Sequence, residues 1–198
     1  MGGTTEELKR LLALYRKGHI SEDLFIEQMA ELEGTDPGSA SPEPAAGNRG
    51  PRGPSLVDML DSYRAAEASG AATIRAWIDL TDDGELEGGL RTIAAREAAH
   101  AELLEQRLAE LGVSAQARIP EWLERYNAAI LDPSASDLDR LGAIVAQFPR
   151  IEDAVEPVRR MAQSVTGDEL TREILLTICD DESATLSWFH DAWKKRQR

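Results

Sequence analysis

The chain has 198 residues, 42% of them hydrophobic and 29% charged, which is typical of a globular protein with one core and room for an appendage. The net charge of −14 repels phosphate backbones, and no apolar run approaches the roughly 18 residues of a membrane-spanning helix, so we expect neither nucleic acid nor membrane as a partner. The single cysteine, Cys179, excludes an internal disulfide and a cysteine-based zinc site, and with no signal-like segment at the N-terminus it predicts a cytoplasmic protein.

Residues 4–33 are predicted to form a small helical hairpin. Leucines repeat at helical spacing from Leu8 onward, Gly18 breaks this helix, and Ser21 can cap a second amphipathic helix. The segment LKRLLALYRKGHISEDLFIEQMAELEG resembles the SHOCT (short C-terminal) domain. A unit of this size buries too little apolar area to be stable alone, so we expect the hairpin to support a homo-oligomer or to dock a protein partner.

Residues 34–55, with the sequence GTDPGSASPEPAAGNRGPRGPS, follow as a predicted flexible linker. The segment is rich in glycine and proline, and it has no hydrophobic side chain larger than alanine. It therefore separates the hairpin from a larger second domain over residues 56–195.

The second domain is predicted to be all-α. Capping patterns and apolar periodicity favour a short helix around Trp122 and Tyr126, and long helices over residues 56–80, 83–111, 137–165 and 168–195. A break or kink is expected at or before Pro149 and Pro157. The long connection between the second and third long helices, set against short turns elsewhere, is the crossover topology of ferritin-like four-helix bundles.

Acidic residues repeat across the two halves of this domain. Glu97 follows Glu67 by 30 residues, as Glu182 follows Glu152. His100 comes three residues after Glu97, whereas Thr185 occupies the matching position after Glu182. Each of these glutamates interrupts an apolar stripe of its helix, and an ionised carboxylate on such a stripe must be paired or metal-bound. The spacing predicts that the carboxylates meet at one level of the bundle.

Residues 56–195 resemble the rubrerythrin-type branch of the ferritin-like superfamily. The motif segments are AAE, REAAHAELLEQRLAELG, IED and DDESATLSWF. The resemblance implies a site for two metal ions, with one of its two histidines replaced by Thr185. The metal ligands predicted in this way are Glu67, Glu97, His100, Glu152 and Glu182. Carboxylates with one histidine favour iron or manganese, as one or two ions.

Alternatives remain open at the third long helix. Asp153 or Glu156 could replace Glu152 if a proline kink rotates the helix, and Arg159 could neutralise Glu152 without any metal. Two functions are therefore consistent with the sequence. The first is a metal protein that oxidises Fe(II) or activates oxygen or peroxide at an incomplete di-metal site. The second is a degenerate bundle that serves as a structural or interaction module without catalysis.

Overall fold

The computed structural model describes residues 55–197. The chain divides after Ser55 into two units, and the helices described below all belong to the second unit, which begins at Leu56. The hairpin expected over residues 4–33 and all of the expected linker except Ser55 lie outside the described residues. The described part is all-helical and contains no strand, as predicted. Its helices are α3 (Leu56–Ile78), α4 (Gly84–Glu110), α5 (Glu121–Ile130), α6 (Asp137–Gln147), α7 (Ile151–Ser164) and α8 (Glu169–Arg196).

Helix boundaries follow local capping chemistry. Ser136 and Asp139 form a capping box at the start of α6. Gly112 ends α4 at a φ of 77° as expected, and its neighbour Val113 donates its amide back to the Leu108 carbonyl at 2.9 Å. The start of α4 differs by one residue from the prediction, because the side chain of Asp83 accepts the free amides of the first turn.

The third long helix of the prediction is broken in two. Phe148 leaves the helical conformation, with φ −124° and ψ 67°, directly before Pro149. A proline ring excludes the preceding residue from helical geometry, so α6 ends here and α7 begins at Ile151. No break occurs at Pro157, which lies inside α7. Only the first of the two expected interruptions therefore divides the helix.

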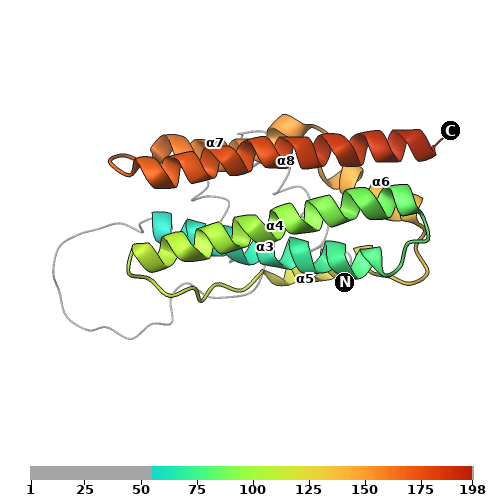
Figure 1. Cartoon of the computed structure of the whole chain (residues 1–198), viewed down its shortest axis with the longest axis horizontal. Helices are drawn as coiled ribbons and strands as arrows, with labels where there is room; N and C mark the ends of the chain where they lie inside the picture. The colour runs from blue at the N-terminus through green and yellow to red at the C-terminus, as the bar shows by residue number, and fades with distance from the viewer. Residues whose placement is uncertain (1–54, 198) are drawn as a thin grey trace, which may run out of the picture. The chain divides into compact units, whose positions relative to one another are not determined.

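The helices form two packed groups (Figure 1). α3 packs along α4, α7 and α6 pack along α8, and the two groups meet where α4 contacts α8. Buried apolar side chains form two separate clusters. One surrounds Trp77, Leu90 and Phe189, and the other surrounds Leu60, Leu104 and Ile178. Because α3, α4 and α8 each contribute to both clusters, their middle turns lie between them.

The connection between α4 and α6 is held against the rest of the unit by polar contacts. Asp61 on α3 accepts the backbone amides of Gln116 and Ala117, both at 2.7 Å. Buried Arg140 donates to the Ile130 carbonyl at the end of α5 at 2.9 Å. These bonds place α5 against α3, beside the middle of the helices. Within residues 55–197, no helix combines the length and apolar character needed to cross a membrane.

Candidate metal centre

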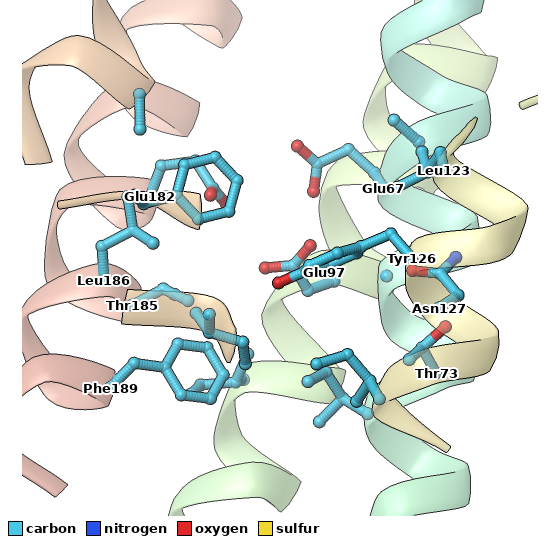
Figure 2. Close-up of a pocket in the computed structure, with 18 of the residues that line it drawn as sticks. Glu67, Thr73, Glu97, Leu123, Tyr126, Asn127, Glu182, Thr185, Leu186 and Phe189 are labelled. Atoms are coloured by element: carbon cyan, nitrogen blue, oxygen red, sulfur yellow. The ribbon is translucent and has the colours of Figure 1, made fainter. Parts of the chain in front are cut away.

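Acidic side chains and one histidine gather between the two apolar clusters. Glu67 comes from α3, His100 from α4 and Glu182 from α8, and their ligand atoms all lie within 4.8 Å of one another. Glu67 and His100 are only 4% and 2% exposed. Figure 2 shows Glu67, Glu97 and Glu182 extending from facing helices into the space between them. Three of the four helices predicted to bring carboxylates to one level therefore do so.

His100 is held on both sides of its ring by carboxylates. Nδ1 lies 3.1 Å from Glu67 Oε2 and 3.8 Å from Glu182 Oε1, whereas Nε2 lies 3.1 Å from Asp181 Oδ2. Asp181 thus fixes the ring with Nδ1 turned into the acidic group. A carboxylate on the outer nitrogen is the arrangement that orients metal-binding histidines and increases their basicity.

Burial of so many acidic groups changes their protonation. Burial raises the pKa of Glu182 to about 8, and the neighbouring Glu97 charge adds to the increase. The pKa of Glu97 is likewise raised, by burial and then by the charge of Glu67. For His100, burial alone would lower the pKa, but the carboxylates of Glu67, Asp181 and Glu182 together outweigh this effect and raise it to about 9. In the absence of another cation, the group therefore holds protons near neutral pH.

Glu97 lies beside the group of Glu67, His100 and Glu182, one turn before His100 on α4. A Cβ atom added to Gly70 would lie 2.8 Å from Glu97 Oε2. The carboxylate therefore rests against the bare backbone of α3, in space that a larger residue at position 70 would fill. The glycine is thus part of the construction of the site, because it lets Glu97 lie beside Glu67.

Glu152 does not join the group, and the prediction that it would is wrong. Its side chain is exposed in the first turn of α7. The break before Pro149 restarts the helix at Ile151, and the register that follows buries Val155 and Val158. Glu152 lies to one side of that buried stripe. An acidic residue there still interacts favourably with the amino end of the helix dipole.

The alternatives to Glu152 are engaged elsewhere. Asp153 pairs with Arg150 at 2.6 Å. Arg159, the alternative partner considered for Glu152, instead lies 3.5 Å from Glu156. His190 also lies outside the group, with its Nε2 2.8 Å from the Phe148 carbonyl oxygen. Among the described residues, α7 therefore supplies no carboxylate to the group.

Thr185, which stands where the resemblance implies a second histidine, is hydrogen-bonded to an arginine. Buried Thr185 accepts a hydrogen bond from Arg96 Nη1 at 2.8 Å. The same guanidinium lies 3.4 Å from Asp181 Oδ1 through its Nε. A fixed positive charge beside Thr185 opposes a second cation there. In the part of the chain that the structure describes, neither a carboxylate from α7 nor a second imidazole is present for the second ion that the resemblance implies, and the Arg96 guanidinium lies beside Thr185.

The sequence did not reveal three functional candidates. Asp181 and Arg96 each directly precede a predicted ligand. Successive side chains on a helix point about 100° apart, so a search along the apolar stripes does not select these two residues. Tyr126 was expected in a short helix, but its orientation depends on how α5 packs. The Asp-Glu pair in the DDESATLSWF segment was the one available signal for Asp181.

The donor atoms present suit a cation. Within residues 55–197 the buried Oε1 of Glu182 has no hydrogen-bond partner, and His100 Nδ1 lies 3.8 Å from it. Carboxylate oxygens with one imidazole are ligands preferred by manganese and ferrous iron. A divalent ion would also replace the protons that the group otherwise holds. The buried group of Glu67, His100 and Glu182 could therefore hold a metal ion.

Comparisons with family models, with curated proteins and with solved structures find no match for this chain. The resemblance to ferritin-like and SHOCT proteins is thus carried by the sequence motifs alone. The function proposed below is inferred from the geometry of the acidic group.

Proposed function

We propose that this protein is a ferritin-like metal protein that binds one iron or manganese ion and uses it to oxidise Fe(II) or to activate oxygen or peroxide. The ligands in this proposal are Glu67, Glu97, His100 and Glu182. The observation that carries it is the orientation of His100, whose Nδ1 faces two carboxylates while Asp181 holds Nε2. Such an outer carboxylate is typical of histidines that bind metals.

A single ion, in place of the pair expected from the repeat, follows from the second half of the site. Glu152 is exposed, and Thr185 is bonded to Arg96. An incomplete ligand shell leaves coordination positions for a small oxidant, and an iron or manganese ion supplies redox chemistry there. The protein's own part is to hold the ion, to keep the imidazole oriented and to limit water around the carboxylates.

A titration with Mn(II) tests the proposal. Full-length protein is stripped with a chelator, and free Mn(II) is followed by electron paramagnetic resonance during addition of the ion. We expect about one ion to bind per chain. Glu67→Gln should abolish this binding, since it removes a buried ligand. Glu152→Gln is the matched control, and it should bind like the parent because Glu152 is exposed. Equal binding by parent and Glu67→Gln would refute the metal site.

One observation favours the second candidate, a bundle that acts as a structural or interaction module. His100 lies between Glu67 and Asp181, and the raised carboxyl pKa values allow the acidic group to stay buried in a protonated form. The same Mn(II) titration separates the two functions. A module without a metal would show no saturable binding, and its thermal unfolding would be the same with and without chelator.

A further inference from the structure

A cavity of about 330 Å³ opens beside the acidic group (Figure 2). It extends along the apolar cluster around Trp77, and its walls come from all the helices of the described unit. Most of the lining is apolar, and representative side chains are Ile74, Ile93, Ile130, Ile144, Leu186 and Phe189. Trp122 on α5 also lines the cavity and is 40% exposed, so one wall adjoins the solvent. A mostly apolar cavity of this size, with a few polar groups at one end, is of the kind that small molecules occupy in proteins.

One end of the cavity is polar. The hydroxyl group of Tyr126 is buried and has no hydrogen-bond partner within the described residues. In Figure 2 its ring extends from α5 across the cavity toward Glu97. A buried hydroxyl without a partner is costly, so an unused hydroxyl aimed into a cavity marks the place where a polar group of a ligand can be held.

The lining also restricts the charge of the ligand. Glu67, Glu97 and Glu182 all contribute to it, and no lysine, arginine or histidine is among the lining residues of the described unit. An anion would meet the carboxyl groups in a poorly solvated space, which disfavours it unless a metal ion is present. A neutral molecule avoids this cost.

We propose that the cavity binds a neutral, compact, mostly apolar molecule with one hydroxyl group, which hydrogen-bonds to Tyr126 beside Glu97. Its size follows from volume, because an apolar cavity of about 150 Å³ accommodates benzene, so this one has room for roughly ten to fifteen non-hydrogen atoms. Two fused six-membered rings with a hydroxyl group fit this description. The role of such a molecule as a substrate of the metal centre rests on the proposed function, but its binding does not.

The test uses metal-free, full-length protein and 2-naphthol as the probe, with binding followed by the fluorescence of the probe. We expect saturable binding, about fivefold to tenfold tighter than that of naphthalene, because only 2-naphthol can bond to Tyr126. Tyr126→Phe should remove this advantage and leave naphthalene binding unchanged. The anion 2-naphthoate should bind more weakly than 2-naphthol. If 2-naphthol shows no saturable binding, or if Tyr126→Phe leaves its advantage intact, the inference is wrong.

A second variant locates the probe without relying on the hydroxyl group. Ala154 lines the cavity from α7, so Ala154→Leu should fill part of it and weaken binding of both 2-naphthol and naphthalene. Ala128→Leu is the control, since Ala128 is exposed on α5. Equal binding by the two variants would place the probe elsewhere and overturn the inference. Since no metal is present, failure of the metal proposal would not alter these results, and failure here would leave the Mn(II) titration unaffected.

Discussion

His100 connects the acidic group to its surroundings. Its inner nitrogen faces Glu67 and Glu182, and its outer nitrogen faces Asp181, which is itself contacted by Arg96. The orientation of a buried imidazole depends on both sides of the ring. Asp181 is therefore a positioning residue in the proposed site, although it is not one of the expected ligands.

Replacing Asp181 should weaken metal binding without removing a ligand. Loss of such an outer carboxylate typically costs about tenfold to a hundredfold in metal affinity, and we expect this range for Asp181→Ala in the Mn(II) titration. Asp180→Ala is the matched control, because Asp180 directly precedes Asp181 on α8 and its side chain is exposed. An unchanged affinity for Asp181→Ala would show that the ring does not need this contact.

Restoring the missing histidine should not restore a second ion. From the sequence alone, Thr185→His is expected to raise metal occupancy. From the structure we expect the opposite, because Arg96 lies beside position 185 and Glu152 is exposed. Metal analysis of the variant should therefore give the same number of ions per chain as the parent. A second equivalent of bound metal would contradict the description of this half of the site.

The residues predicted as metal ligands differ in how well the sequence predicted their positions. Glu67, Glu97, His100 and Glu182 interrupt apolar stripes of unbroken helices, and helical periodicity places such residues reliably. Glu152 shares the spacing but follows a break, and the register of a restarted helix depends on tertiary packing.

At the scale of elements, α4 depends on close contacts as well as on capping. Gly88 and Gly89 are neighbours on this helix with different surroundings. A Cβ atom on Gly88 would meet nothing within 4 Å, whereas one on Gly89 would lie 1.8 Å from the Trp188 ring. Gly89 thus lets α8 approach α4 closely, and Gly88 has no such role.

The two glycines should respond to alanine in opposite directions. Gly88→Ala should stabilise the protein by about 0.5–1 kcal/mol, because alanine is the better helix former. Gly89→Ala should destabilise it by about 1–3 kcal/mol, since Trp188 must move. Chemical denaturation measures both changes in the free energy of unfolding. Stabilisation by both substitutions would show that α4 and α8 do not pack as described.

Asp61 should make the stability of the connection depend on pH. Burial raises its pKa, but bonds from the Gln116 and Ala117 amides and from Arg64 outweigh this effect, so the net pKa lies below the usual 3.8. A lowered carboxyl pKa stabilises the fold above the unfolded value, and this stabilisation is lost as the pH falls through the folded value. Asp61→Asn should therefore cost about 2 kcal/mol near neutral pH.

The difference between parent and Asp61→Asn should shrink as the pH falls below 3.8. Denaturation at several pH values measures it, with Asp79→Asn as an exposed control on the segment after α3. A difference that does not change with pH would mean that the carboxylate charge is not what holds the connection.

Helix existence and most helix ends were predictable because their causes are local. Ser136, Gly112 and Pro149 act through their own capping bonds or backbone geometry. The cavity was not predictable, because its shape depends on where α5 rests against α3 and on the gap between the two helical groups.

At the scale of the whole molecule, the described unit contains every residue of the proposed metal site. Deleting residues 1–54 should therefore leave a protein whose far-ultraviolet circular dichroism spectrum is still that of a helical protein. Its Mn(II) affinity should be unchanged. The sequence also predicts that residues 4–33 support self-association, so the deletion should reduce the assembly mass in light scattering. An unchanged mass would leave only the docking role for this segment.

The central claim is that one ion binds between Glu67, His100 and Glu182. Crystals of the full-length protein grown with Mn(II) or Fe(II) can be measured by anomalous diffraction at the absorption edge of each metal. The account predicts a single peak beside His100 Nδ1 and the carboxylate oxygens of Glu67 and Glu182. No peak at this group, a second peak beside Thr185, or an ion bound through Glu152 would contradict it.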